Sequence, residues 1–220
     1  MMIRVLAVLA VISVACVSAN LQGLCSGAKK CPIYKLIKKY NGYEEREYEP
    51  SVWIETTQSA GESKLEVFTR LFRYTTGANA RSETVPKHLP VVGHLSMVAG
   101  VAQHENMRFF LGQDSPTFNP PNPADAAVHI HRDPKQKYYV LGFRTTDWRN
   151  MELWKAKARH LKAITGSTLN EFCAASYGPR EGEKYNEVWI HTSSDHGDHH
   201  HHHHGHNDGH DHHADGHAHE

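Results

Sequence analysis

The residues with the clearest potential for chemistry are histidines gathered at the C-terminal end of the chain. Thirteen of the twenty histidines follow Ser194, together with six acidic residues and no lysine or arginine. Neutral imidazole is a good ligand for zinc, copper and nickel, and a flexible chain can present three or four imidazoles to one ion. We therefore predict a metal-binding tail over residues 195–220, with these ligands: His199, His200, His201, His202, His203, His204, His206, His210, His212 and His213.

This tail contains no apolar residue larger than alanine. A segment of that composition cannot bury a core, so we predict that it is disordered. The run His199–His204 has the length of an expression tag, but seven more histidines surround it and a secretory leader begins the chain. We therefore interpret the tail as natural.

The N-terminal residues have the three parts of a secretory signal peptide. Arg4 gives the positive start, Val5–Val17 the apolar stretch, and Val17-Ser18-Ala19 a cleavage site of small residues. The apolar stretch is shorter than the roughly 20 residues that a membrane-spanning helix needs. We predict a signal peptide over residues 1–19, a secreted, extracellular protein, and no membrane span later in the chain.

Three cysteines remain after the leader, an odd number for an oxidising compartment. Cys25 and Cys31 enclose a short loop that contains Gly27, so this pair is the favoured disulfide, although a bridge from either to Cys173 stays open. Cys173 lies in an apolar stretch, which favours a buried thiol.

The charge of the body of the protein is small. Residues 20–194 carry 23 basic and 18 acidic residues without a basic run, which does not favour a nucleic-acid partner. No Ser-His-Asp order, HExxH motif or phosphate loop stands out, so we expect no enzyme. Five histidines of the body are isolated and are expected to be structural or surface residues: His88, His94, His104, His160 and His191. His129 and His131 alternate on a predicted strand and share one face, which makes them a better candidate pair.

Apolar periodicity predicts two similar series of elements. The first has strands over Ile33–Tyr40 and Tyr43–Thr57, a helix over Glu62–Thr76, and strands near Val85–Ala99 and Ala102–Leu111. After a proline-rich loop, the second has strands over Val128–His131 and Tyr138–Thr145, a helix from a cap at Asp147 to about Thr165, and strands near Phe172–Tyr177 and Glu187–His191. This repetition predicts an α+β domain of two related halves with two helices on its sheets, and a groove between helix and sheet that could hold a ligand.

Five short motifs then resemble those of the SOUL haem-binding family, in the family's order and over residues 32–191. They are Tyr43–Pro50 (YEEREYEP), Leu71–Asn79 (LFRYTTGAN) with Pro90-Val91 after it, Phe118–Pro121 (FNPP), Tyr177–Pro179 (YGP) and Asn186–Trp189 (NEVW). The resemblance implies a distorted β-barrel of two pseudo-symmetric halves, each an antiparallel sheet with a helix. It gives a division into the signal peptide, a cysteine-containing segment over 20–31, a SOUL-like domain over 32–194 and the tail over 195–220.

The resemblance also implies a ligand and a site. Members bind haem or other tetrapyrroles in a hydrophobic groove beside the first helix, without catalysis. The matching apolar residues here are Leu65, Phe68 and Phe72, and plain core packing is the competing interpretation of this stripe. Arg73 and Arg180 match residues that meet the propionates, which suits the forked guanidinium group, and ordinary surface arginines are the competing interpretation. A relative with cysteine at the position of Cys173 supports a free thiol there.

This sequence departs from the family at one position. Some members carry a histidine, proposed as the axial iron ligand, where this chain has Glu47. We therefore expect apolar contact to hold the ring. Two other hypotheses remain: a metal-sequestering protein whose domain mainly carries the tail, and an enzyme of a related fold. The enzyme would need a buried carboxylate or a tyrosine pair facing the groove.

Overall fold

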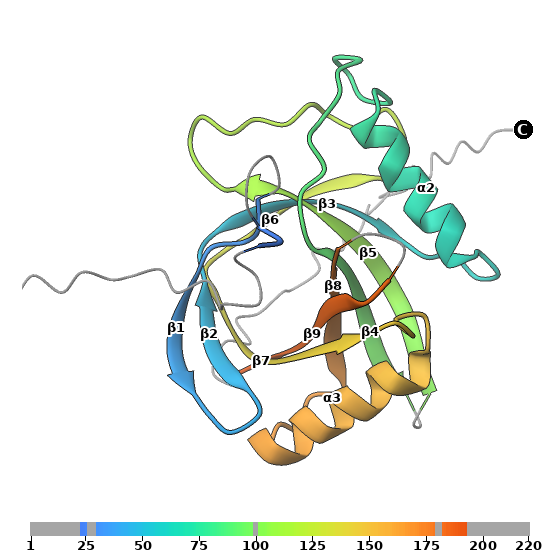
Figure 1. Cartoon of the computed structure of the whole chain (residues 1–220). Helices are drawn as coiled ribbons and strands as arrows, with labels where there is room; N and C mark the ends of the chain where they lie inside the picture. Colours follow the sequence, from blue (N-terminus) through green and yellow to red (C-terminus); the bar gives the residue numbers. More distant parts are fainter. Residues whose placement is uncertain (1–22, 26–29, 99–100, 179–181, 193–220) are drawn as a thin grey trace, which may run out of the picture.

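The computed structural model describes residues 23–25, 30–98, 101–178 and 182–192. Nine strands form one antiparallel sheet that curls into a half-barrel, with two helices on its outer side (Figure 1). This is the α+β distorted barrel expected from the sequence. Among the described residues, no helix is long and apolar enough to cross a membrane.

The elements repeat in order along the chain. The first series is β1 (Tyr34–Lys39), β2 (Glu44–Tyr48), β3 (Ser51–Thr57), α2 (Lys64–Thr75), β4 (Val91–Val98) and β5 (Val101–Gln113). The second is β6 (His129–Asp133), β7 (Gln136–Thr145), α3 (Met151–Thr165), β8 (Glu171–Tyr177) and β9 (Lys184–His191).

The strand order shows how the two halves are joined. It runs β1-β2-β7-β9-β8-β4-β5-β3-β6. The second half contributes three adjacent strands in the order β7-β9-β8. The first half contributes β3-β5-β4, so that β7 corresponds to β3, β9 to β5 and β8 to β4. The halves also exchange one strand each. β2 of the first half pairs with β7 of the second, and β6 of the second half pairs with β3 of the first. The pseudo-symmetric halves are therefore interlocked within one sheet, with β1 added at one edge.

Side chains alternate between the two faces of the sheet, as the strand repeat requires. The inner face carries an aromatic cluster that includes Tyr48, Trp53, Phe110 and Trp189. The outer face carries two further clusters, one beneath α2 and one beneath α3. Both faces of the sheet are thus covered by apolar packing.

Three boundaries differ from the sequence prediction. The strand expected near Val85–Ala99 begins at Val91, because residues 85–90 form the loop that leads into β4. The single strand expected over Tyr43–Thr57 is two strands, because the chain bends at Glu49-Pro50 and passes from a β7 partner to β5 and β6. The cap of the second helix is Asn150 rather than Asp147, and its side chain accepts hydrogen bonds from the amides of Glu152 and Leu153 at 3.0 and 3.3 Å. Asp147 instead accepts from the Asn150 side-chain amide at 2.8 Å.

The segment before β1 packs on the inner face. Cys25 and Cys31 form the disulfide, and together with Leu24 they contact the inner aromatic cluster. The backbone amide of Leu89 donates to the carbonyl of Lys30 at 3.0 Å, which fixes the segment to the loop before β4. The predicted pairing is confirmed, and Cys173 is the buried free thiol.

Candidate functional site

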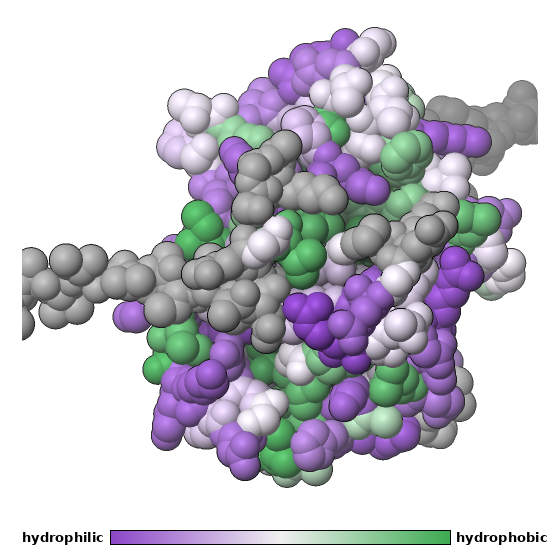
Figure 2. Space-filling model, in the orientation of Figure 1, coloured by the Kyte–Doolittle hydropathy of each residue, from purple (hydrophilic) through white to green (hydrophobic). Residues whose placement is uncertain are grey.

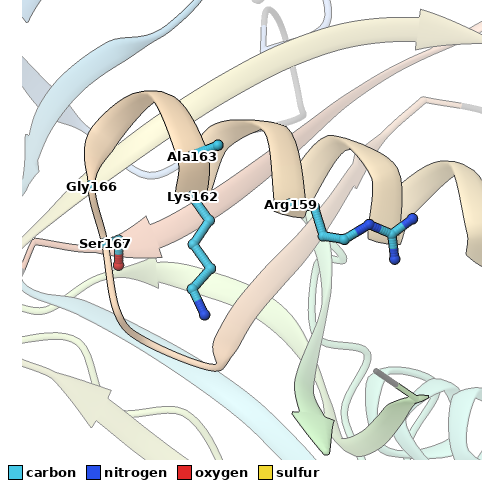
Figure 3. A pocket seen from close by; sticks show the side chains of 5 residues that line it. All are labelled: Arg159, Lys162, Ala163, Gly166 and Ser167. Carbon is cyan, nitrogen blue, oxygen red and sulfur yellow. The ribbon is translucent and has the colours of Figure 1, made fainter. Parts of the chain in front are cut away.

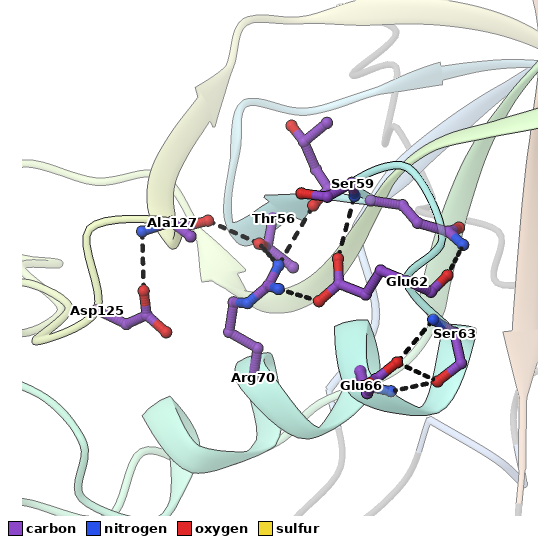
Figure 4. A network of polar contacts seen from close by, with 10 residues as sticks. Thr56, Ser59, Glu62, Ser63, Glu66, Arg70, Asp125 and Ala127 are labelled. Carbon is purple, nitrogen blue, oxygen red and sulfur yellow. Dashed lines mark hydrogen bonds and ion pairs between the residues drawn. The ribbon is translucent and has the colours of Figure 1, made fainter.

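The first helix is held in place at its N-terminus by polar contacts. Ser63 caps α2, and Ser63 and Glu66 form a reciprocal capping box. Arg70 reaches from α2 to the hydroxyl of Thr56 on β3 at 2.8 Å and pairs with Glu62, as Figure 4 shows. This network fixes the position of α2 relative to β3 and thereby determines which side of the helix faces outward.

Family-like motifs hold the C-terminal end of α2. The Tyr74 hydroxyl donates to the carbonyl of Pro121 in the proline-rich loop at 2.9 Å. The Asn79 side chain donates to the carbonyl of Tyr74 at 3.0 Å and to that of Glu83 at 2.8 Å. Burial raises the pKa of Tyr74 to about 12, so its hydroxyl remains a donor. These motif residues therefore shape the turn after the helix.

The sequence-predicted groove residues lie at the surface of α2. Val67, Leu71 and Tyr74 form the buried side of the helix. Leu65 is 64% exposed and Phe72 is 43% exposed, while Phe68 is half-buried and packs on Phe109. The structure therefore brings Leu65, Phe68 and Phe72 together as an exposed stripe beside the core-facing stripe. We call these three residues the α2 patch.

Two phenyl rings of the α2 patch are stacked on each other. The rings of Phe68 and Phe72 lie 6.2 Å apart between centroids and are within 12° of parallel. Phe68 also contacts the ring of Phe109 at 5.1 Å, so a buried strand residue supports it from below. The more exposed ring, that of Phe72, can contribute aromatic contact to a ligand that binds at this surface.

The structure adds a cation near the α2 patch to the two arginines that the sequence suggested, whose role stays a prediction. Arg73 is exposed and follows Phe72, so it lies about 100° further round the helix. Arg180 lies outside the described residues. Lys87, in the loop before β4, places its ammonium over the rings of Phe68, Phe72 and Phe109, at 5.4, 5.6 and 5.8 Å from their centroids. Nothing in the local sequence around Lys87 indicates this position, which results from the return of the chain after α2.

Glu47, at the position of the family's axial histidine, lies on a strand that α2 does not pack against. Glu47 lies on β2, which pairs with β1 and β7, whereas α2 packs on β3 and β5. Its carboxylate pairs with Lys135 at 3.5 Å and with Lys137 at 3.9 Å. Glu47 therefore serves a surface ion-pair group.

The histidines of the inner face make structural contacts. His88 is buried, and its Nδ1 accepts from the amide of Lys30 at 3.3 Å. His94 Nε2 lies 3.2 Å from the Sγ of Cys173. Burial and nearby Arg108 lower the pKa of His94 to about 3, and burial raises the pKa of Cys173 to about 12. The pair is thus neutral near pH 7 and does not provide a thiolate nucleophile.

A carboxylate with tyrosines does lie inside the barrel, which bears on the enzyme hypothesis. Glu187 is fully buried and pairs with Arg46 at 2.9 Å. It also accepts from the hydroxyls of Tyr177 and Tyr185 at 3.0 Å each and from Trp189 Nε1 at 2.8 Å. Gly142 leaves the space for the Tyr185 hydroxyl, because a Cβ at Gly142 would overlap it.

The electrostatics of this buried group are those of a stable ion pair. Burial opposes the charge of Arg46, but Glu187 and the neighbouring tyrosines outweigh it, so the pKa of the guanidinium is raised. Burial raises the pKa of Tyr177 and of Tyr185, which keeps both hydroxyls protonated donors. Glu187 and its partners lie on the inner face, whereas the α2 patch lies on the outer side. The carboxylate does not face the predicted groove.

Two hollows lie elsewhere on the described part of the chain. One, between Tyr48, Trp53, Tyr138 and Trp189 on the inner face, has a volume of about 10 Å³, which is room for about one water molecule. The other is an open depression of about 340 Å³ at the end of α3, lined by Arg159, Lys162, Ala163, Gly166 and Ser167 (Figure 3). It has no aromatic lining. Neither hollow suits a large planar apolar ligand as well as the α2 patch does.

Exposed apolar side chains elsewhere are scattered. Hydrophobic residues form small separate groups among hydrophilic ones on the face seen in Figure 2. The large exposed hydrophobics of the described chain are Ile33, Ile37, Leu65, Phe72 and Ile164, and two of them belong to the α2 patch. Within the described ranges, no group of three metal-ligating side chains is placed to hold an ion. The predicted signal peptide and the histidine tail lie outside the described residues.

Comparisons with known proteins agree with the motifs. A family model described as SOUL heme-binding protein matches residues 29–191. Comparison with curated proteins gives no match.

Comparison with solved structures gives matches at low identity. An EcmrR–DNA complex has a TM-score of 0.45 at 9% identity, over 69% of this chain and 57% of that one. SAV2435 bound to tetraphenylphosphonium has a TM-score of 0.40 at 13% identity, over 73% of this chain and 99% of that one. A putative transcription regulation protein from Staphylococcus aureus has a TM-score of 0.39 at 11% identity, over 68% and 96%.

Proposed function

The chain belongs to the SOUL heme-binding protein family, and from this premise we propose that it is a secreted, non-enzymatic protein that binds haem or a related tetrapyrrole at the α2 patch. The observation that carries the proposal is the exposure of Leu65 and Phe72 on a helix that already buries another stripe. Large apolar side chains grouped at a protein surface indicate a binding site, because their exposure to water contributes nothing to the stability of the fold.

The energy available from apolar contact is sufficient for binding. If the macrocycle and the α2 patch remove about 200 Å² of apolar area from water, the gain is about 5 kcal/mol at ~25 cal/mol/Å², before the costs of association. Iron ligation by the domain is not required in this proposal. Glu47 supports that point, because a carboxylate paired with lysines stands where some relatives have histidine.

The absence of catalysis is also part of the proposal. The buried carboxylate Glu187 already accepts from three neutral donors and from its cationic partner Arg46, and it faces away from the α2 patch. A group so fully engaged would need to lose several hydrogen bonds before it could act as a base. Secretion is supported by the leader sequence and by the Cys25–Cys31 disulfide.

We further propose that the tail binds zinc, copper or nickel ions independently of the α2 patch. Its support is the sequence alone, thirteen histidines and six acids within 26 residues. Imidazole nitrogens supply the ligands, and the carboxylates add attraction for a cation. The metal-sequestering hypothesis, in which the domain is mainly a carrier, differs in that it predicts no ligand at the α2 patch.

The proposal that haem binds at the α2 patch is tested by a haem titration followed by absorbance. Phe72→Glu should weaken binding about tenfold or more, because it places a charge against the macrocycle face. The control is Ile164→Glu on α3, where the side chain is exposed to a similar degree, 39% against 43%, but has no aromatic patch beside it. If both variants bind haem like the natural protein, the α2 patch is not the site.

A further inference from the structure

The second helix carries much of the positive charge of the domain. α3 has four cationic residues, Lys155, Lys157, Arg159 and Lys162, and the single acid Glu152, which gives it a net charge of +3. Residues 20–194 as a whole carry 23 basic and 18 acidic residues, a net charge of +5. The 15 residues of this helix therefore hold more than half of the excess positive charge.

Two of these cations line the open depression at the C-terminal end of α3 (Figure 3). Arg159 is exposed, and the Lys162 ammonium uses one of its three donors on the side-chain oxygen of Asn170, at 2.9 Å. Together their charges exceed the partial negative charge, about half a unit, at the C-terminal end of a helix. The other lining residues are small: Ala163, Gly166 and Ser167. The depression can therefore take an extended anionic segment that has small side chains.

The chain leaves the domain at the same end of the sheet. Cys173 on β8 pairs with Trp189 on β9, so the start of β8 and the end of β9 lie side by side. α3 packs against β9, and only residues 166–170 join its C-terminal end to the start of β8. The last described residues, which lead into the tail, therefore lie near the depression.

The tail has the charge and the reach that this surface requires. Residues 195–220 carry six acids and no lysine or arginine. A flexible chain of that length spans about 28 Å on average, whereas a helix of the length of α3 extends about 22 Å. The tail contains no apolar side chain larger than alanine, so a shallow polar surface suits it better than an apolar groove.

We propose that the carboxylates of residues 195–220 dock on α3 of the same chain, against Arg159 and Lys162. The attraction is between opposite charges at an exposed surface, so it weakens as salt is added. This inference is independent of the α2 patch and of metal binding, because it uses the carboxylates of the tail and leaves its imidazoles for other ligands. Docking places the tail over the second half of the sheet, whereas α2 packs on the first half (Figure 1).

The test is carbodiimide cross-linking of the full-length protein at low salt, followed by peptide mass spectrometry. This reagent joins a carboxylate directly to an amine, without a spacer. Tail carboxylates should link to Lys162 several times more often than to Lys137. Lys137 is the matched site, because its carbonyl accepts from the amide of Thr192 at 3.1 Å, so it is also near the start of the tail. Its ammonium, however, lies beside Glu47, at 3.9 Å. Equal linking to the two lysines would overturn the proposal.

Arg159→Glu separates docking from mere proximity, since it reverses the neighbouring charge and keeps Lys162 as the amine that is linked. It should lower the tail links to Lys162 about threefold or more. The control Lys35→Glu makes the same change of net charge at an exposed position on β1, and it should leave these links unchanged. Added salt tests the same point without a substitution and should lower the links to Lys162. Links that resist both salt and Arg159→Glu would contradict docking.

Two further measurements identify the occupant of the α3 surface. Mixing protein with and without heavy-isotope labels distinguishes links within one chain from links between copies, and a majority between copies would overturn docking on the same chain. Vesicles that contain phosphatidylserine provide an anionic lipid surface. If the natural protein sediments with these vesicles and Arg159→Glu does not, while the tail links are the same in both, α3 is a lipid-binding surface and the proposal is wrong.

Discussion

Replacing Glu187 with glutamine tests whether the buried carboxylate is part of the framework of the fold. The carboxylate is 0% exposed, and its partner Arg46 is 2% exposed at 2.9 Å. Glu187→Gln keeps the shape but removes the charge and puts an amide N–H₂ among four donors. Removing one partner of a buried ion pair costs about 3–5 kcal/mol, because the other charge remains buried.

Two features of the structure adjust this magnitude. Glu44 also pairs with Arg46, at 2.8 Å, and it is 18% exposed, so part of the compensation survives. The amide keeps one oxygen, so two of the four donors lose their acceptor, either Tyr177 and Trp189 or Tyr185 and Arg46, and an unsatisfied buried donor costs about 1–3 kcal/mol. We therefore expect a loss of about 3 kcal/mol or more in the free energy of unfolding.

The assay is urea denaturation followed by tryptophan fluorescence and circular dichroism. Glu183→Gln is the control, since its pair with Arg144 is at 3.7 Å and its side chain is 57% exposed, and such pairs contribute about 0–1 kcal/mol. A loss below about 1 kcal/mol for Glu187→Gln would refute the framework role. Normal stability with altered ligand binding would instead assign Glu187 to a site.

Two further predictions concern pH. His94 has a pKa near 6.5 in the unfolded chain, and burial lowers its pKa to about 3 in the folded protein. The contribution of neutral His94 to the free energy of unfolding is therefore fully present above pH 6.5. It falls as the pH drops, by about 2 kcal/mol between pH 6.5 and pH 5. Denaturation at pH 7 and at pH 5 should show that the free energy of unfolding falls less in His94→Gln than in the natural protein. An equal fall in both proteins would contradict the lowered pKa of His94. The tail should bind more than one zinc ion at pH 7.4 and release most by pH 5.5, because protons compete for the imidazoles and change the tail charge from about −3 at pH 7 to about +6 at pH 5.5. Calorimetric titration of the full chain against a form ending at Ser194 measures this, and equal stoichiometry would show that the tail holds no metal.

The sequence contains enough to predict the class of fold, but not how its halves interlock. Apolar periodicity locates both helices to within a few residues, because each buries a distinct stripe such as Trp154, Ala158 and Leu161 on α3. The exchange of β2 and β6 between the halves depends on contacts across most of the chain. Arg46 and Glu187, for example, are 141 residues apart, and no local pattern predicts their pairing.

The candidate site is only partly predictable for a similar reason. On α2, the stripe of Leu65, Phe68 and Phe72 and the stripe of Val67, Leu71 and Tyr74 are both apolar, and periodicity does not tell which one faces the core. The structure resolves that question, and it adds Lys87, whose position depends on a loop. Several motif residues that identify the family, including Arg46, Tyr177 and Trp189, serve the buried network around Glu187 rather than the α2 patch.

The most direct test of tetrapyrrole binding by the domain is a haem titration of the chain ending at Ser194 beside the full-length protein. Both should give the same Soret change with one haem per chain held by the domain, since the α2 patch lies within residues that both contain. Additional haem on the full-length protein alone would belong to the tail histidines. Loss of the Soret change on removal of the tail would contradict the account, because it would place haem binding in the histidines and leave the α2 patch without a ligand.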